Sequence, residues 1–419
     1  MDLGNSISLV FCIPFAGMLL SIAVFPLIAP EWWEKRQPLV VALWSLLFLI
    51  PFAVKFGFPV MGEQLLEVVV GDYITFIVLL FGLFCVAGNI SLEGDLIGSP
   101  GVNVILLLAG TLLASWIGTT GASMVMIRPL LRANKWRRRK MQTVIFFIFL
   151  VSNIGGCLTP VGDPPLLMGF MRGVPFFQSL RFLPVLAVNA AILLIVFYIL
   201  DSRAYQKDIR EGLSPGKEML AAKSGSLRIS GAHNILFLAI IVLAVILSGV
   251  LPGIPMFSGG IHIYGEVTFS YGALIEVILI LAAALLSYRT TNRRVREENH
   301  FSWGAIQEVA VLFIGIFITM IPALLILQAK GAELGLTKPW QMFWITGAMS
   351  SFLDNTPTYL VFLTTAGTLG ASSGIQTTVG IIPAIMLQAI SCGAVFMGAN
   401  TYIGNAPNFM VKAIAEENG

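Results

Sequence analysis

The sequence predicts an all-α polytopic membrane protein, and three observations support this fold class. Of the 419 residues, 57% are hydrophobic and 11% are charged, whereas a soluble protein carries roughly 25% charged residues. The motif G-x-x-T-x-[VI]-G-[DN]-x-P ends an apolar run at 156–165 and another at 398–407. Two more apolar stretches, 101–131 and 339–369, are interrupted at their middles by polar residues. Irregular backbone at membrane depth survives only inside protein or along a cavity. The pattern therefore indicates an inverted-repeat transporter with two re-entrant helical hairpins and two broken transmembrane helices.

The continuous apolar segments are long enough to cross a membrane, which takes roughly 20 residues. They are 6–28, 39–60, 73–90, 141–170, 179–200, 233–251, 271–288, 303–328 and 380–410. The first of them is too long for a signal-peptide core and is interpreted as a retained span. The two interrupted stretches contain the polar sequences GTTG at 118–121 and DNTP at 354–357. Each of these stretches is either one span with a polar patch or a re-entrant hairpin that enters and leaves by the same face.

The distribution of basic residues distinguishes these two interpretations. Basic clusters occur at 35–36, 132–140, 201–228 and 289–296, and the positive-inside rule places all of them in the cytoplasm. We take the N-terminus to be outside and both interrupted stretches to be hairpins. All four basic clusters then lie on the cytoplasmic side, and the C-terminus, as given, lies inside. Two full spans would instead put the last two clusters opposite the first. The charge pattern therefore favours hairpins, which then enter from opposite faces as an inverted repeat requires.

The only sizeable polar segment divides the chain into halves of similar order. The expected parts are a first inverted repeat at 1–200 (hairpin 101–131, broken span 141–170), a cytoplasmic linker at 201–232 with room for a short amphipathic helix, and a second inverted repeat at 233–419 (hairpin 339–369, broken span 380–410). We expect the second repeat to lack a final span, and we interpret this as truncation.

Composition argues against several other classes of protein. The net charge is +3, and no basic run with interleaved aromatic residues suggests a nucleic-acid partner. The four cysteines lie in apolar segments, which is typical of small core residues and not of a disulfide framework or zinc site. The motif HExxH is absent from the sequence, the three histidines lie at span ends or in loops, and no acid/base pair is apparent by spacing, so we do not expect an enzyme. We expect no cofactor other than a sodium ion or proton that couples transport.

Asp163 follows the first break and is the first candidate site residue. Pro164 and Pro165 favour a helix start, so Asp163 could simply be its N-cap. Alternatively, Asp163 and Thr159 hold an ion or substrate at a positive helix end near the bilayer midplane. A carboxylate at the bilayer centre costs about 2.5–3.5 kcal/mol on insertion scales, and such residues are usually functional. We therefore predict that Asp163 binds an ion.

The second break and the hairpin tips supply the other candidates. In the second break Asn405 replaces the aspartate, and its amide suits a cation, an anion or a cap on broken backbone. Asp354 at the second tip is the predicted proton carrier, although it could also cap the second leg. The predicted ion- or substrate-binding set is Thr119, Thr120, Ser123, Asn153, Gly156, Thr159, Gly162, Asp163, Asp354, Asn355, Thr356, Thr358, Asn400, Thr401, Gly404, Asn405 and Asn408, with Asp163 and Asp354 as the hypothetical sodium ligands.

Two intramembrane glutamates are weaker candidates for a role in transport. Glu276 and Glu308 each lie one to two turns inside a predicted span. Either side chain can reach the membrane interface or take part in transport.

At these motifs the chain resembles the ion transporter superfamily. That superfamily includes NhaD-type sodium/proton antiporters, CitMHS-like citrate carriers, arsenite efflux proteins and divalent anion/sodium symporters. The sequence GGCLTPVGD at 155–163 resembles the NhaD-type pattern of two glycines followed by T-P-[IV]-G-D, and DNTP at 354–357 is similar to its second aspartate-asparagine tip. The resemblance implies an elevator-like or rocking transport domain on a dimeric scaffold, with Asp163, Asp354 and Asn355 in the ion site.

The first hairpin departs from the NhaD-type pattern. NhaD-type proteins carry aspartate-asparagine before two threonines, and here Trp116 and Ile117 occupy those places. One acidic ligand is therefore missing, which leaves the cation assignment open.

Two functions remain as alternatives. The main prediction is a sodium/proton antiporter in which Asp163 and Asp354 bind cation or proton, because no buried arginine is placed to neutralise a carboxylate substrate. The alternative is a sodium- or proton-coupled symporter of citrate or another carboxylate, received at positive half-helix ends. A channel is less consistent with duplicated broken helices, which suit alternating access. We expect a multi-pass protein of a prokaryotic cytoplasmic membrane, a small ion or carboxylate as its ligand, and a homodimer.

Overall fold

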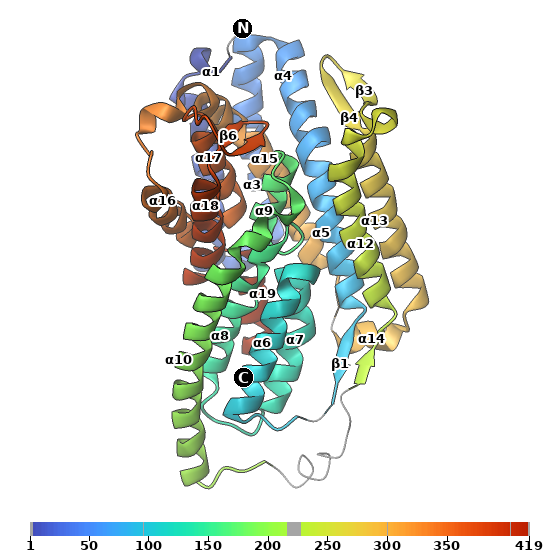
Figure 1. Ribbon diagram of the computed structural model, residues 1–419, viewed down its shortest axis with the longest axis vertical. Coiled ribbons are helices and arrows are strands. Elements are labelled where there is room, and N and C mark those ends of the chain that lie inside the picture. Colours follow the sequence, from blue (N-terminus) through green and yellow to red (C-terminus); the bar gives the residue numbers. More distant parts are fainter. Residues whose placement is uncertain (1–2, 95, 216–227, 300, 403, 418–419) are drawn as a thin grey trace.

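The computed structural model describes residues 3–94, 96–215, 228–299, 301–402 and 404–417. Within these residues the fold is an elongated bundle of helices (Figure 1). Nine helical segments there are long and apolar enough to cross a membrane: Leu9–Ile28, Pro30–Phe56, Phe58–Gly88, Pro100–Ile117, Met141–Leu158, Phe176–Arg210, Asn234–Gly253, Tyr271–Thr290 and Gly304–Leu334. The predicted span 380–410 corresponds instead to a shorter apolar helix at 384–400. The chain is thus an all-α multi-pass membrane protein, as predicted.

The first helices extend through the segments that separate the predicted spans. A short α1 (Leu3–Ser6) precedes α2 (Ile13–Ile28), and only Ala29 separates α2 from α3 (Pro30–Phe56). Proline at the first position starts α3 without losing a hydrogen bond. Residues 61–72, which lie between the predicted spans 39–60 and 73–90, are also helical: α4 (Phe58–Leu66) continues through a π-helical segment, Glu67–Tyr73, into α5 (Ile74–Gly88). Two acidic residues of this segment have tertiary partners: Glu63 accepts a hydrogen bond from the N–H of Glu266, and Asp72 pairs with Arg172.

The first interrupted stretch forms a pair of packed helices. α6 (Pro100–Ile117) and α7 (Thr119–Ala133) contact each other and are joined by Gly118 alone. Gly118 has a φ of 78°, which glycine adopts without steric cost. Next come α8 (Met141–Leu150), a 3-10 turn (Ile154–Leu158) and α9 (Pro164–Met171). The first break, between α8 and α9, therefore lies where the sequence predicted a broken span.

The second interrupted stretch repeats this order. α16 (Pro339–Phe352) and α17 (Asn355–Gly367) contact each other across Leu353 and Asp354. α18 (Ala384–Met397) and α19 (Ala406–Glu417) follow, and the second break lies between them. A short antiparallel pair, β5 (Ile375–Thr377) and β6 (Gly380–Ile382), connects α17 to α18.

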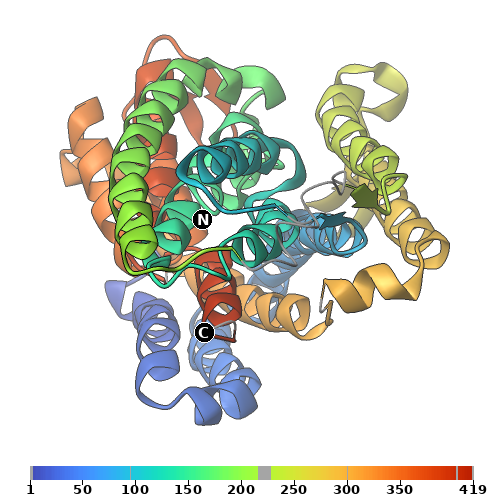
Figure 2. The ribbon, with the colours of Figure 1, turned by 90° about the horizontal axis from the view of Figure 1, so that it is seen from below.

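The remaining long helices lie on the outside of the molecule. α10 (Leu183–Arg210) lies at one edge, and α12 (Asn234–Val250) and α13 (Tyr271–Thr290) lie at the opposite edge in both views (Figures 1 and 2). α14 (Arg293–Glu298) leads into α15 (Gly304–Lys330), which packs against α2, α3 and α17. Two further antiparallel strand pairs are β1 (Ser91–Glu93) with β2 (Arg228–Ser230), and β3 (Gly260–Tyr264) with β4 (Val267–Ser270). The short strands were not predicted, and they lie outside the nine long apolar segments.

The predicted linker 201–232 is only partly described. Its first residues extend α10 to Arg210, and residues 216–227 lie outside the described part of the chain. The end of α10 is fixed by buried ion pairs, because Arg137 contacts Asp201 at 2.8 Å and Asp208 at 3.6 Å. Arg139 also bonds Asp208, at 2.8 Å, and Glu211.

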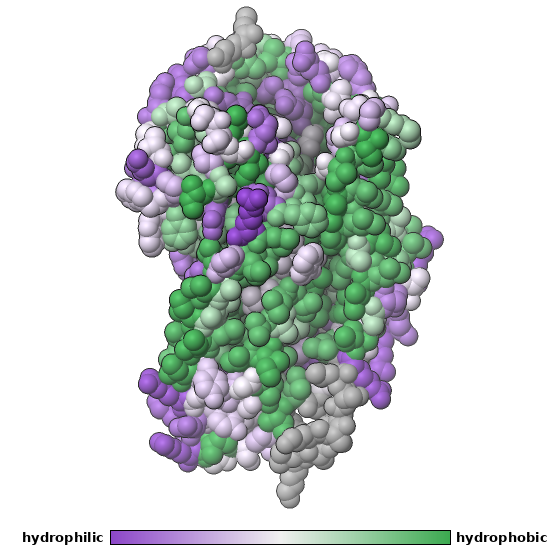
Figure 3. Space-filling model, viewed as in Figure 1, coloured by the Kyte–Doolittle hydropathy of each residue, from purple (hydrophilic) through white to green (hydrophobic). Residues whose placement is uncertain are grey.

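The surface supports a membrane environment. Hydrophobic side chains cover most of the middle of the face in Figure 3, and hydrophilic side chains gather toward its two ends. Exposed apolar residues on the outer helices include Val188, Ile192, Ile195, Leu236 and Leu243. In water such a surface would be unfavourable, whereas lipid tails cover it at no cost. The basic residues of α14 and the basic end of α10 lie at the same end of the molecule (Figure 1).

Candidate ion and substrate site

The two helix pairs meet the two breaks through equivalent backbone hydrogen bonds. The N–H of Thr119, the first residue of α7, donates to Gly162 O at 2.8 Å. The N–H of Asn355, the first residue of α17, donates to Gly404 O at 3.2 Å. Each helix-pair tip is therefore attached to the break of its own half of the chain.

The glycines of the repeated motif let each break fold back on itself. A Cβ on Gly162 would overlap Gly156 O, and a Cβ on Gly404 would overlap Gly398 O. Any side chain at either position would force the backbone to move. The motif glycines therefore shape the breaks, which is a structural role for Gly156, Gly162 and Gly404.

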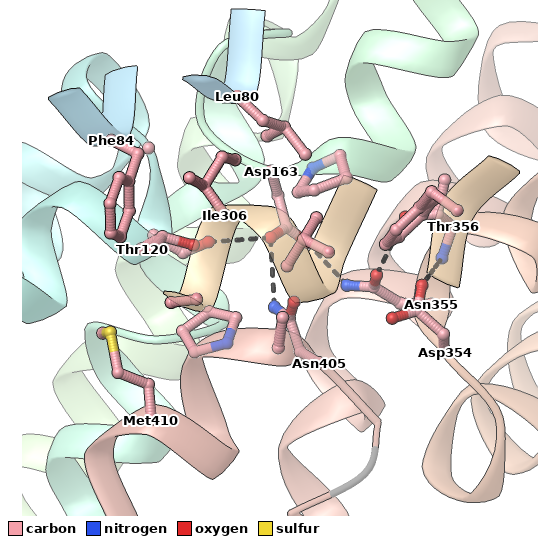
Figure 4. Close-up of a pocket in the computed structure, with 18 of the residues that line it drawn as sticks. Leu80, Phe84, Thr120, Asp163, Ile306, Asp354, Asn355, Thr356, Asn405 and Met410 are labelled. Atoms are coloured by element: carbon pink, nitrogen blue, oxygen red, sulfur yellow. Dashed lines mark hydrogen bonds between the residues drawn. The ribbon is translucent and has the colours of Figure 1, made fainter. Parts of the chain in front are cut away.

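Asp163 lies at the centre of the site and is 1% exposed. Its Oδ1 accepts hydrogen bonds from Thr119 Oγ1 at 3.0 Å and from Asn405 Nδ2 at 3.1 Å, and its Oδ2 accepts one from Asn355 Nδ2 at 2.8 Å (Figure 4). The carboxylate makes no capping hydrogen bond to α9, although Asp163 occupies the N-cap position. The capping alternative considered for Asp163 is therefore wrong for its side chain.

Asp354 faces the same cavity from the second tip. Its Oδ1 accepts a hydrogen bond from Thr356 N at 3.0 Å, so the capping role considered for this residue is present. The carboxylate also lines the cavity that Asp163 and Asn355 line (Figure 4). Asp354 can therefore cap α17 with one oxygen and still meet a ligand in the cavity.

Four helices begin at this site. α7, α9, α17 and α19 start at Thr119, Pro164, Asn355 and Ala406, and each of these residues lines the cavity. Unpaired backbone N–H groups give a helix N-terminus a positive partial charge, which favours an anion. Among the described residues that line the cavity there is no lysine, arginine or histidine; the charged ones are Asp163, Asp354 and Glu308.

The cavity has a volume of about 220 Å³ and lies between the two tips and a set of apolar helices. We call α2, α3, α5 and α15 the wall helices, because they supply the side chains that face the tips. These are Ile22, Pro26, Trp33, Leu79, Leu80, Leu83, Phe84, Ala305, Ile306, Glu308, Val309, Leu312, Phe313 and Ile316. A mostly apolar pocket with a few convergent polar groups is the usual form of a small-ligand site.

The structure divides the predicted site residues into two sets. Those that line the cavity are Thr119, Thr120, Gly162, Asp163, Asp354, Asn355, Thr356 and Asn405. The others lie behind it and bond to protein groups. Asn153 donates to Asn408 Oδ1 at 2.6 Å and accepts from Asn405 Nδ2 at 3.3 Å, so it supports the cavity-lining Asn405.

Most of the remaining predicted residues satisfy broken backbone or each other. Asn408 donates to Gly398 O at 2.8 Å, and Thr401 Oγ1 donates to Ser351 O at 2.5 Å. The corresponding residue of the first break, Thr159, donates to Ser115 O. The other bonds of this kind are Asn400 to Ser351 Oγ at 2.8 Å, Thr358 to Asp354 O at 3.0 Å, and Ser123 with Ser152 at 2.9 Å. These contacts hold the breaks and tips in shape.

The two tips of this chain can be compared with each other through their backbone hydrogen bonds. The matching bonds to Gly162 and Gly404 pair Thr119 with Asn355, and therefore Gly118 with Asp354. Trp116 is 44% exposed and does not line the cavity. The first tip thus has Gly118 and Thr119, not Trp116 and Ile117, where the second has aspartate and asparagine.

Sequence reasoning missed most of the cavity wall. Leu80, Phe84 and Ile306 face Asp163 across the cavity (Figure 4), but they belong to uniformly apolar spans without a distinguishing pattern. Tyr402 lines the cavity from inside the repeated motif, so its position could have been found there. Among the described residues, no group of three or more His, Cys, Asp or Glu side chains is arranged to hold a metal ion. Sodium ligation by Asp163 and Asp354 stays a prediction.

The fold and this site together define a polytopic membrane protein of the secondary transporter class. The family model CitMHS_2, described as "Putative citrate transport", matches residues 4–419, and the chain belongs to this family. The expected CitMHS-like membership is confirmed. No curated protein matches the chain. The family gives no specific support to sodium/proton antiport and agrees better with the carboxylate alternative. Membership in a transport family also agrees with the expectation that the chain is not an enzyme.

Proposed function

We propose that this protein is a secondary active symporter of citrate or another small carboxylate, coupled to sodium ions or protons. The observation that carries the proposal is the position of Asp163. Its carboxylate is buried where four helix N-termini meet and is held by three neutral donors, in a cavity where the described lining residues include no basic side chain.

This arrangement suits an anion that arrives together with cations. Helix N-termini and the amides of Asn355 and Asn405 can bind a carboxylate substrate. Asp163 and Asp354 would repel that substrate unless a cation or proton neutralised them, because like charges at close range disfavour each other. Binding of the coupling ion would then be required for binding of the carboxylate, and this requirement is the basis of symport.

The architecture supports alternating access. We interpret α6–α7 and α16–α17 as re-entrant hairpins of two inverted repeats, since their tips make matching hydrogen bonds to the two breaks. The site lies between these elements and the wall helices. Movement of the hairpins and broken helices relative to the wall helices would expose the cavity to each side in turn.

The orientation and assembly are part of the same proposal. The end that carries α14 and the basic end of α10 would face the cytoplasm by the positive-inside rule, with the N-terminus outside and the C-terminus, as given, inside. We propose a prokaryotic cytoplasmic membrane as the location and a homodimer as the working form, with no nucleic-acid partner.

Uptake of labelled citrate into proteoliposomes tests this function. Wild-type protein should accumulate citrate under an imposed sodium or proton gradient, and Asp163→Asn and Asp354→Asn should each lower accumulation. Glu276→Gln is the matched control, because Glu276 is a buried intramembrane carboxylate that does not line the cavity. Wild-type vesicles that are well sealed and show no gradient-dependent uptake of citrate or other small carboxylates would exclude the proposal.

Sodium/proton antiport remains the second candidate, because two aspartates line the cavity and no basic residue does so within the described part of the chain. A pH-sensitive dye inside the same vesicles separates the two functions. Antiport predicts a pH change when sodium or lithium is added without carboxylate, whereas symport predicts ion movement only with the substrate.

A further inference from the structure

A third carboxylate, Glu308, faces the cavity from the wall helices. We propose that Glu308 binds the coupling cation at one end of the cavity, before the cation reaches Asp163 and Asp354. This inference rests on the proposed function and deepens it, because it adds a residue of the wall helices to the cation path. The cation is sodium or a proton, since a carboxylate can bind either.

The position of Glu308 is defined by its helix. It lies one turn inside α15, which begins at Gly304 directly after the basic segment α14. Its backbone oxygen accepts a hydrogen bond from Gln37 Nε2 of α3 at 3.4 Å, which ties α15 to α3 at this point. The residue is half-buried and lines the same cavity as Asp163 and Asp354. Glu308 thus lies in the first part of α15, near the α14 end of that helix in sequence, and lines the cavity from there.

The charges around Glu308 favour a cation. Glu34, on α3, repels Glu308 electrostatically, and no ion pair joins Glu308 to a basic residue in the described part of the chain. On α19, Lys412 pairs with Glu416 at 3.3 Å and lies over the ring of Tyr402 at 5.1 Å. A cleft lined by charges of one sign raises the local concentration of counter-ions.

Glu308 and the two aspartates line the cavity from different elements of the fold. Asp163 and Asp354 belong to the breaks and tips, whereas Glu308 belongs to the wall helices. If the tips move relative to the wall helices during transport, the distance between Glu308 and Asp163 changes with each cycle. A cation held by Glu308 would then pass to the tips in only one of the two conformations.

Citrate exchange at equal cation concentrations on both sides of a proteoliposome tests this role without knowledge of protein orientation. One arm varies sodium at fixed pH, and the other varies pH in choline chloride. Glu308→Gln should raise the sodium concentration for half-maximal exchange about tenfold, or move the half-maximal pH down by about one unit, with the maximal rate changed by less than about twofold. Glu308→Asp should recover most of the shift, and Glu276→Gln should behave as the wild type. Unchanged curves in both arms for Glu308→Gln would overturn the proposal.

A second measurement separates this proposal from the proposed function. The melting temperature of purified full-length protein is compared in sodium chloride and choline chloride without citrate. A smaller sodium-dependent rise in Glu308→Gln than in the wild type supports cation binding at Glu308. If the wild type exchanges no citrate, the proposed function fails and this comparison decides alone. Equal rises above zero in the two proteins would then overturn the role of Glu308. If sodium gives no rise in the wild type, the same comparison is made between two pH values in choline chloride, and equal shifts there would overturn it.

Discussion

Asn355 and Asp163 are 192 positions apart in the chain, and Asn355 Nδ2 donates a 2.8 Å hydrogen bond to Asp163 Oδ2. The bond joins the tip of the second helix pair to the first break. Asn405, from the second break, bonds the other oxygen of the same carboxylate. Neither half of the chain therefore contains a complete site, and residues from both halves hold the carboxylate.

The near-symmetry of the site predicts that a carboxylate at position 405 can partly replace the carboxylate at position 163. Asp163 and Asn405 occupy equivalent places in the repeated motif and touch at 3.1 Å. Asp163→Asn alone should lower cation-dependent citrate uptake about a hundredfold, which corresponds to about 2.7 kcal/mol of lost binding. The double variant Asp163→Asn/Asn405→Asp restores one carboxylate at the centre, so its uptake should exceed that of Asp163→Asn about tenfold when measured in proteoliposomes.

The double variant should not reach the uptake of the wild type, because the surroundings of residue 405 differ from those of residue 163. Asn405 Nδ2 also lies 3.1 Å from Ser152 O and 3.3 Å from Asn153 Oδ1, and an aspartate at this position would repel both acceptors. Asn405→Asp alone places two carboxylates in contact and serves as the control for added charge. A double variant no more active than Asp163→Asn would show that the position of the carboxylate, and not only its charge, is essential.

The motif glycines should tolerate no side chain. Gly162→Ala would place a Cβ against Gly156 O and 3.1 Å from Ser115 Cα, so the first break must shift. Overpacking of this kind costs about 1–3 kcal/mol. The variant should melt several degrees lower and lose uptake. The buried thiols of Cys85, Cys157 and Cys392 provide the assay, because a thiol-reactive dye reaches them only on unfolding.

Gly101→Ala is the matched control for Gly162→Ala. No atom lies within 4 Å of a Cβ at Gly101, and this residue is in α6. Alanine is favoured over glycine inside a helix by about 0.5–1 kcal/mol, so the melting temperature should stay the same or rise. Equal melting temperatures for wild type and Gly162→Ala would contradict the tight packing of the first break.

The breaks and tips could be predicted from the sequence because they violate the pattern of a membrane span. Glycine, proline and polar side chains within an apolar run interrupt the helix, and the interrupted backbone is stable in a membrane only inside the protein or along a cavity. Asp163, Asp354 and Asn355 were predicted on this basis, and all three line one cavity. The apolar wall could not be predicted, because Leu80 and Phe84 differ in no local property from the lipid-facing residues of the same kind of span.

The helical segment 61–72 shows why loop predictions from charge can fail. The predicted spans end at residue 60 and begin again at 73, which leaves Glu67 and Asp72 between them, yet the chain is helical throughout. Asp72 is buried and pairs with Arg172, 100 positions later. Such a partner is visible only in three dimensions, whereas a single sequence shows only the unfavourable charge.

The contacts at the end of α10 predict a pH dependence of stability. Hydrogen bonds from Arg139 hold the pKa of Glu211 below its ordinary value. A lowered pKa in the folded state means that this contribution is present above the ordinary value of about 4.3 and is lost as the pH falls through the lower value. Glu211→Gln should therefore melt slightly below the wild type at pH 7, because the pair is exposed and weak. The difference should vanish once the pH falls below the lowered pKa of Glu211, and a difference that stays constant through this titration would contradict the assignment.

The ion pair between Asp72 and Arg172 connects two parts of the molecule that transport would have to separate. Asp72 lies in the helix that continues into the wall helix α5, and Arg172 ends α9 after the first break; their side chains meet at 2.7 Å. Asp72→Asn or Arg172→Gln alone leaves one charge without its partner. Each should lower the melting temperature by several degrees, equivalent to about 1–3 kcal/mol. This is less than the cost at a fully buried pair, because the Arg172 side chain keeps 22% exposure.

The double variant Asp72→Asn/Arg172→Gln distinguishes the pair from two independent residues. Removing both charges avoids the unpaired charge, so the double variant should lose less stability than the sum of the single losses, and the difference measures the coupling. If the pair also restrains movement of α9 against the wall helices, citrate exchange by the double variant should be faster than that of the wild type at saturating cation. Additive losses of stability together with an unchanged exchange rate would show that the contact neither stabilises the fold as a pair nor controls access to the cavity.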